Sequence, residues 1–227
     1  MKFEIHLKPG KITLFLMLVV AFLITASLIG QYSTYFKGDG HLQGFVPQFN
    51  LDREMNIPTW FSSACFLFAA LLLWQLGVAA VGVSRKYWRG LSMVFIYLSL
   101  DETAAIHETA VEPMRHLFNA RGLLYFSWVI LGAFFVTVLA ILYCRFLLSQ
   151  PKFTRNLFFF SAGLFIVGTL GMEMIGGRHV EIYGSNNFTY ALIANCEESL
   201  ELIGLVVFLY ALMDLLQKRQ RTAKHVL

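Results

Sequence analysis

Acidic side chains are concentrated in two apolar stretches of the chain. The first stretch also carries a histidine, and no lysine or arginine lies between the acids of either stretch. An ionised carboxylate near the centre of a bilayer costs roughly 2.5–3.5 kcal/mol, so several together need compensation. The sequence therefore predicts a site that holds protons, metal ions or water. Its candidate ligands are Asp101, Glu102, His107, Glu108, Glu197, Glu198 and Glu201.

Carboxylate oxygens with a single imidazole favour hard divalent cations. Mg²⁺, Mn²⁺ and Ca²⁺ prefer oxygen ligands, and Fe²⁺ also accepts an imidazole such as that of His107. A thiolate zinc site is not indicated, because Cys196 is the only cysteine near the acids in the sequence. The predicted cofactor is therefore a divalent cation, namely Mg²⁺, Mn²⁺, Ca²⁺ or Fe²⁺. The alternative is a site that binds a transported cation or a proton and holds no resident metal ion.

Helical spacing places the three glutamates of the second stretch on one face. Steps of about 100° per residue put Glu197, Glu198 and Glu201 within one narrow arc. Tyr190 falls on the same stripe and is positioned to donate a hydrogen bond to one of them. Glu173 and His179, near the predicted outer end of the preceding apolar stretch, are further candidates around the site.

The elements that position these residues are predicted to be membrane-spanning helices. Of the 227 residues, 57% are hydrophobic and 14% are charged, against roughly a quarter charged in a soluble domain. Apolar runs long enough to cross about 30 Å of hydrocarbon recur along the whole chain, and helices suit them. The sequence predicts an all-α, polytopic bundle forming one integral membrane domain over 1–227. Its six predicted spans cover about 12–36, 59–83, 91–108, 123–148, 157–175 and 188–216.

The connecting segments predict the orientation of the bundle. Lysine and arginine gather before the first span, after the second and fourth, and in the C-terminal tail. Because cytoplasmic loops carry these residues in excess, both termini are predicted to be cytoplasmic. The net charge of +4 follows this pattern, and no basic face for nucleic acid is indicated. Alternatively, residues 1–30 form a cleaved secretory signal, which would leave five spans.

Three segments of the chain resemble a family of uncharacterised bacterial multi-pass membrane proteins. They are the run Ser-Leu-Asp-Glu at 99–102 with His-Glu at 107–108, the segment 54–62, and the run Glu-Glu-Ser-Leu-Glu at 197–201. The resemblance implies a bacterial setting, hence the inner membrane. It also implies that Glu54 and Ser62 lie near the site.

Three functions fit the acidic stretches at this point. The leading interpretation is a carboxylate cage in the lipid bilayer that binds cations and serves ion or proton-coupled transport. The second is a metal-dependent membrane enzyme acting on a lipid or quinone-like substrate. The third is a subunit or assembly factor of a membrane complex, whose acids hold a cationic group of a partner membrane protein. All three require the two acidic stretches to converge on one cavity.

Overall fold

The computed structural model describes residues 8–225, and in this range the chain is helical with no β-strand. The predicted all-α class is confirmed. In chain order the helical elements are α1 (Pro9–Tyr32), η1 (Ser33–Lys37), η2 (Leu42–Gly44), α2 (Phe45–Phe49), α3 (Ile57–Ala79), α4 (Val83–Ala104), η3 (His107–Ala110), α5 (Val111–Phe118), η4 (Gly122–Leu124), α6 (Val129–Leu148), α7 (Lys152–Ile166), η5 (Val167–Met172), α8 (Glu173–Tyr183) and α9 (Phe188–His225).

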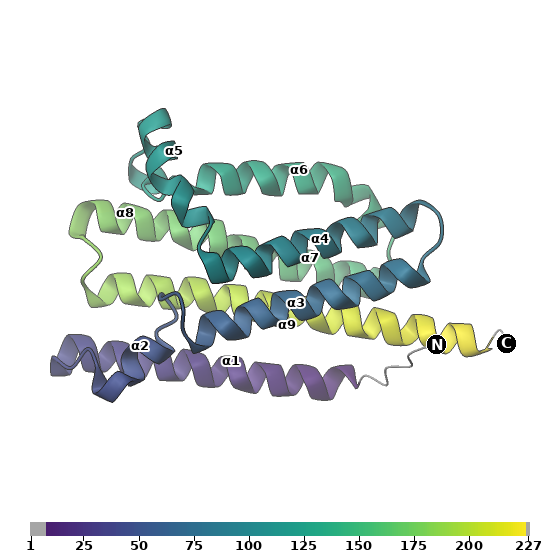
Figure 1. Ribbon diagram of the computed structural model, residues 1–227, viewed down its shortest axis with the longest axis horizontal. Helices are drawn as coiled ribbons and strands as arrows, with labels where there is room; N and C mark the ends of the chain where they lie inside the picture. The colour runs from purple at the N-terminus through teal and green to yellow at the C-terminus, as the bar shows by residue number, and fades with distance from the viewer. Residues whose placement is uncertain (1–7, 226–227) are drawn as a thin grey trace.

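The long helices run along one common axis (Figure 1). α1, α3, α4, α6, α7 with α8, and α9 alternate in direction, so α1 begins at the same end of the bundle at which α9 finishes. The short helices α2 and α5 both lie at the opposite end. This arrangement is that of a serpentine helical bundle with short connections.

Five helical segments of the described chain are long and apolar enough to cross a membrane. They are Pro9–Lys37, Ile57–Ala79, Val129–Leu148, Lys152–Tyr183 and Phe188–Thr222. Each overlaps a predicted span. The predicted span 91–108 corresponds to α4, which does not qualify by composition because basic residues crowd its start and acids its end. Five of the six predicted spans therefore have the required length and composition.

Several predicted span boundaries differ from those of the helices: α4, α6 and α7 begin at Val83, Val129 and Lys152 rather than at about 91, 123 and 157, and α3 ends at Ala79 rather than 83. Two other boundaries differ as well. α4 stops at Ala104, short of residue 108, because Ala105 adopts a left-handed backbone with φ +47°. The helix predicted to end at 175 continues to Tyr183 through Gly176 and Gly177. Gly177 lies where the chain approaches closely, because a Cβ there would stand 3.1 Å from the backbone nitrogen of Phe126.

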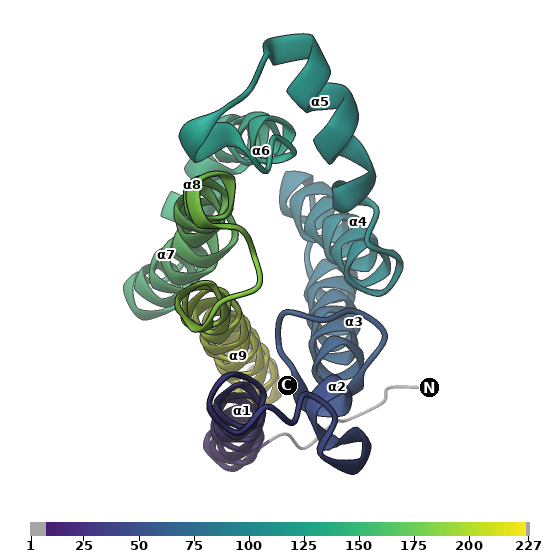
Figure 2. The ribbon, with the colours of Figure 1, turned by 90° about the vertical axis from the view of Figure 1, so that its left-hand side faces the viewer.

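Viewed from the end that carries α2 and α5, the helices form two walls (Figure 2). α3 and α4 make one wall, and α6, α7 and α8 belong to the other. α9 contacts α3 on one side and α7 on the other, so it closes the base between the walls. α5 lies across the opposite edge, beyond α4 and α6.

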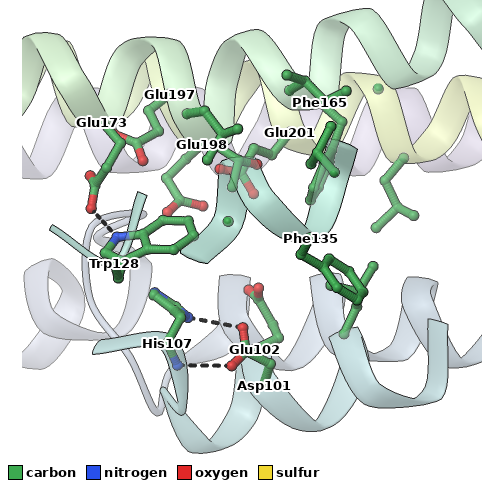
Figure 3. A pocket seen from close by; sticks show the side chains of 18 of the residues that line it. Asp101, Glu102, His107, Trp128, Phe135, Phe165, Glu173, Glu197, Glu198 and Glu201 are labelled. Atoms are coloured by element: carbon green, nitrogen blue, oxygen red, sulfur yellow. Dashed lines mark hydrogen bonds and ion pairs between the residues drawn. The ribbon is translucent and has the colours of Figure 1, made fainter. Parts of the chain in front are cut away.

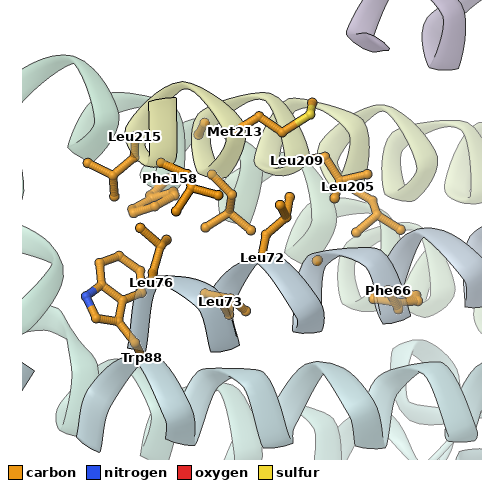
Figure 4. Close-up of a cluster of buried hydrophobic side chains, with 14 of the residues drawn as sticks. Phe66, Leu72, Leu73, Leu76, Trp88, Phe158, Leu205, Leu209, Met213 and Leu215 are labelled. Carbon is orange, nitrogen blue, oxygen red and sulfur yellow. The ribbon is translucent and has the colours of Figure 1, made fainter. Parts of the chain in front are cut away.

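The hydrophobic core fills the space between α3, α4 and α9 (Figure 4). Leu72, Leu73 and Leu76 of α3 pack against Leu209 and its neighbours in α9. Trp88 of α4 is also fully buried in this cluster. Its indole faces Phe146 and Phe158, so this tryptophan is part of the core.

Glycines let the other wall approach α9 closely. A Cβ at Gly204 would stand 3.0 Å from both the Phe165 nitrogen and the Ser161 oxygen of α7. A Cβ at Gly168 of η5 would stand 2.9 Å from the carbonyl oxygen of Glu197. Small residues of this kind allow helix backbones to meet in a membrane. These contacts fix the acidic face of α9 relative to α7 and α8.

Candidate functional site

A cavity of about 1080 Å³ lies between the two walls. The predicted acids of α4 approach it from one side and those of α8 and α9 from the other, as Figure 3 shows. The structure therefore brings together two acidic stretches that are far apart in the sequence. Every predicted ligand lines this cavity: Asp101, Glu102, His107, Glu108, Glu197, Glu198 and Glu201.

Asp101 holds the turn that follows α4. Its Oδ1 accepts a hydrogen bond from the backbone N–H of His107 at 2.9 Å, and its Oδ2 lies 2.9 Å from Nδ1 of the same histidine. The indole of Trp128 packs against the imidazole, with ring centroids 4.7 Å apart. The imidazole is thereby fixed in orientation, and Nε2 is the ring nitrogen left for a ligand.

Glu102 points from the next position of α4 toward α3. Its carboxylate accepts a hydrogen bond from the Ser62 hydroxyl. Glu54, in the segment before α3, also lines the cavity, and its Oε2 is buried with no hydrogen-bond partner in the described part of the chain. The two residues implied by the family resemblance, Glu54 and Ser62, thus lie at the site.

On the opposite wall, Glu173 connects three elements. It is the first residue of α8, and its Oε1 accepts a hydrogen bond from the indole N–H of Trp128 at 2.6 Å. Its carboxyl group also lies within hydrogen-bonding reach of Glu197 on α9. Two carboxyl groups this close repel when both are ionised, so the pair is suited to holding one proton between them.

Glu198 and Glu201 are half-buried acids of α9 that line the cavity. Glu201 lies beside the hydroxyl of Thr169, in the π-helical segment η5. Glu198 points into the cavity (Figure 3), and among the described residues none forms a hydrogen bond with its carboxyl group. A carboxyl group that lines a cavity between apolar helices and has no partner is costly unless a ligand, water or a proton satisfies it.

The segment between α1 and α3 covers one edge of the cavity with two more acids. The hydroxyl of Tyr190 on α9 lies 3.3 Å from Oδ1 of Asp52 and donates to it. Loss of water around the carboxyl group raises the pKa of Asp52 from its ordinary value of 3.8 to about 6. Burial, with Glu102 and Glu108 nearby, raises the pKa of Glu54 from 4.5 to about 7. Both groups lie outside the long apolar helices.

His179 is the one predicted site residue that lies away from the cavity. Its Nε2 lies 2.9 Å from Oδ1 of Asn187, in the connection between α8 and α9. The side chain therefore supports that connection and does not line the cavity, so its contribution to the site stays a prediction. Sequence reasoning also missed two residues: Asp52, in a loop, and Trp128, which touches His107 and Glu173.

Negative charge dominates the lining of the cavity. Among the described residues, ten carboxylates line it, against two arginines and one histidine. One of the two arginines, Arg115, donates to Glu112 and to the carbonyl oxygen of Tyr125. The positive charge left on Arg53 and His107 is too small to neutralise the ten acids.

Away from the acids the cavity continues into an apolar cleft between α4, α6, α7 and α9. Phe95 of α4 and Phe208 of α9 stack with ring centroids 4.8 Å apart at its side. Phe135 of α6 and Phe165 of α7 lie nearer the acids (Figure 3). The site thus has an acidic end and an apolar end.

Within residues 8–225, no group of three or more histidine, cysteine, aspartate or glutamate side chains is placed to hold a metal ion. Several acids are instead attached to their own surroundings, Asp101 to His107, Glu102 to Ser62 and Glu173 to Trp128. The divalent-cation cofactor stays a prediction.

Comparison with known proteins gives a family without an assigned activity. No curated protein and no solved structure matches the chain significantly. A family model described as "Domain of unknown function (DUF8692)" matches residues 12–216 and so includes the acidic residues of both walls. The chain belongs to this family, DUF8692.

Proposed function

We propose that the protein binds cations at its acidic cavity within a membrane and uses this site for ion or proton-coupled transport. The observation that carries the proposal is the convergence of acids from α4, α8 and α9 on one cavity between apolar helices. Ionised carboxylates in a bilayer need compensation. The few arginines and the single histidine at the cavity do not supply it, so cations or protons do.

The proposed setting is the inner membrane of a bacterium, with six crossings and both termini in the cytoplasm. α4, the third crossing in chain order, is the one that brings the five qualifying segments to six. It lies beside α3 along the same axis, which supports this assignment. Its basic residues Arg85, Lys86 and Arg89 stand at the cytoplasmic end, as the positive-inside rule requires. Its acids Asp101 and Glu102 face the cavity instead of lipid.

Protons are the simplest ions for this site to carry. Glu173 and Glu197 are close enough to share one, and Glu198 is free to bind another. Binding of a cation from outside displaces such protons, because the two kinds of positive charge compete for the same carboxylates. Competition of this kind couples the movement of a cation to the movement of protons in the opposite direction.

The test uses the full chain reconstituted in vesicles with a pH-sensitive dye inside. Imposed gradients of Na⁺, K⁺ or Mg²⁺ are expected to drive proton movement in the wild type. Glu198→Gln removes the unpartnered charge, and we expect it to abolish that movement. Asp214→Asn is the matched control, since Asp214 lies on the same helix, 2.7 Å from Lys218 and away from the cavity lining. A wild type that moves neither cation nor proton contradicts the proposal.

A second candidate, a metal-dependent membrane enzyme, is favoured by one observation. Asp101 orients the imidazole of His107 as carboxylates orient metal-bound histidines in many sites. The apolar cleft would then receive a lipid or quinone-like substrate. Elemental analysis of the purified protein separates the two candidates. A stoichiometric metal that is lost on His107→Ala supports the enzyme, and a metal-free protein that moves protons supports the transporter.

A further inference from the structure

The two ends of the cavity differ in chemistry and are continuous with each other. The acidic end is formed by Asp101 and Glu102 of α4 with Glu197, Glu198 and Glu201 of α9. The apolar end reaches Phe208, which lies eleven residues beyond Glu197 and seven beyond Glu201 on α9. At 1.5 Å per residue these separations are about 16 Å and about 10 Å, roughly a third to a half of the hydrocarbon thickness of a bilayer. A hydrated inorganic ion would use only the acidic end.

The acidic end favours a positive charge that needs no fixed coordination geometry. Its carboxylates exceed the arginines that line the same cavity. No set of three metal-binding side chains is positioned around a point in the described chain. An organic ammonium group spreads its charge over a larger volume than a metal ion does. Glu198, which has no hydrogen-bond partner among the described residues, is placed to neutralise it.

Aromatic rings line the passage between the two ends. Trp128 lies among the acids, and Phe135 and Phe165 follow toward the apolar end (Figure 3). Faces of such rings attract cations, especially quaternary ammonium groups. Their edges and faces also pack against alkyl chains. The passage therefore suits a molecule in which a cationic head is joined to a hydrophobic chain.

Helix α6 leaves the cleft accessible from its side. Among its residues only Val129 and Phe146, near its two ends, are buried. Phe135 and Cys144 line the cleft and are at the same time exposed. In a bilayer these positions face lipid, so a hydrophobic molecule reaches the cleft without passing through water.

We propose that the cation bound by this site is an amphiphilic organic cation, with its ammonium head among the carboxylates and its chain in the apolar cleft beside α6. The inference rests on the proposed cation-binding function and names the class of its substrate. The cation enters laterally from the bilayer, and its positive charge replaces the protons held by the α8 and α9 glutamates.

Cys144 supplies a reporter for this proposal. The experiment uses the full chain with Cys196→Ser in nanodiscs of neutral lipid, so that Cys144 is the accessible cysteine of the described chain and Cys65 is buried. The rate of labelling by N-ethylmaleimide is measured with butyl-, octyl- and dodecyltrimethylammonium. Tetramethylammonium has the charge without the chain, and dodecyl maltoside has the chain without the charge. We expect protection that strengthens with chain length and is absent with both controls.

The variants test the acidic end independently of labelling at the apolar end. Glu198→Gln is expected to weaken the apparent affinity for dodecyltrimethylammonium about tenfold, the loss typical of one charge-assisted contact. Asp214→Asn is expected to leave it unchanged. The proposal would be overturned if dodecyl maltoside protected Cys144 as well as the cation does. It would also be overturned if dodecyltrimethylammonium gave no protection of Cys144 in the chain that carries Cys196→Ser alone.

The two proposals fail in distinguishable ways. If inorganic cations drive proton movement that Glu198→Gln abolishes, and an alkyl chain adds nothing to binding, cation transport stands and the amphiphilic substrate is refuted. If neither inorganic nor alkylammonium cations bind or move, both proposals are refuted.

Discussion

α3 and α6 are apolar helices of similar length in very different surroundings. α3 spans 23 residues and buries eleven of them, whereas α6 spans 20 and buries two. In the proposed membrane setting hydrophobicity does not explain the difference, because lipid chains are as apolar as leucine. The difference in burial comes from the hydroxyl groups and small residues through which α3 contacts α4. Ser63 lies 2.9 Å from Ser99 of α4, and Ser92 of α4 donates to the Ala70 carbonyl oxygen at 2.8 Å.

The comparison shows where the bundle is free to bind something else. The packed side, formed by α3, α4 and α9, uses its contacts to hold the fold together. The open side, at α6, has few buried residues that hold the fold together, and its side chains line the cleft. We therefore expect substitutions on the packed side to affect stability, and substitutions on the open side to affect binding.

The largest effect is expected for Leu73→Ala on the packed side. Leu73 has no exposed surface, so truncation leaves a cavity and should cost about 2–5 kcal/mol of unfolding free energy. Leu142→Ala on α6 is the matched change, and since Leu142 is 56% exposed its cost should be near zero. Denaturant unfolding in mixed micelles measures both. Equal losses for the two variants would refute the distinction between the sides.

A smaller effect is expected where α7 meets α9. Gly204→Ala places a Cβ 3.0 Å from two backbone atoms that cannot move freely, and overpacking of this kind costs about 1–3 kcal/mol. Gly163→Ala on α7 is the control, because no atom lies within 4 Å of a Cβ at that position. Thermal unfolding should show a lower Tm for Gly204→Ala alone. If both variants unfold like the wild type, the two helices do not pack as closely as described.

The sequence predicted much of this bundle because its signals are local. Long apolar runs fix the helices, and α1 and α3 begin within about three residues of the predicted positions, the usual precision of such boundaries. Acids inside apolar runs are costly, so their convergence on one cavity also followed from the sequence. Gly204, seven residues after Glu197, falls beside the acidic stripe of its helix by helical spacing, and it is where α7 approaches.

The remainder depends on tertiary contacts that no local pattern contains. The helix predicted to end at 175 continues to Tyr183, where Gly177 makes room for Phe126. Ala105 ends α4 without the glycine usual at a left-handed position, because the side chain of Asp101 secures the following turn. Asp52 reaches the cavity only because the loop before α3 folds over it toward Tyr190.

The pH dependence of stability tests that loop at the edge of the open side. The pKa of Asp52 is about 6 in the folded protein and about 3.8 when unfolded, so folding favours the protonated carboxyl group. Its stabilising contribution is complete below pH about 4 and is lost as the pH rises through about 6. Asp52→Asn mimics the protonated form and accepts from Tyr190 in the same way. Its Tm should exceed that of the wild type at pH 7 and equal it at pH 4. A variant less stable than the wild type at pH 7 would contradict the raised pKa.

The smallest effect is expected for Ala105→Gly, at the turn that carries His107 into the cavity. A left-handed conformation costs a residue with a Cβ roughly 1–2 kcal/mol, which glycine avoids. Glycine also loses more backbone entropy on folding, so the net gain should be less than about 1 kcal/mol. The contacts of Asp101 with the His107 N–H and imidazole do not involve the Ala105 side chain, so cation binding should be unchanged. Unfolding and Cys144 protection, measured on the same variant, separate these two expectations. A stabilised variant with weakened binding would show that strain in this turn serves the site rather than the fold.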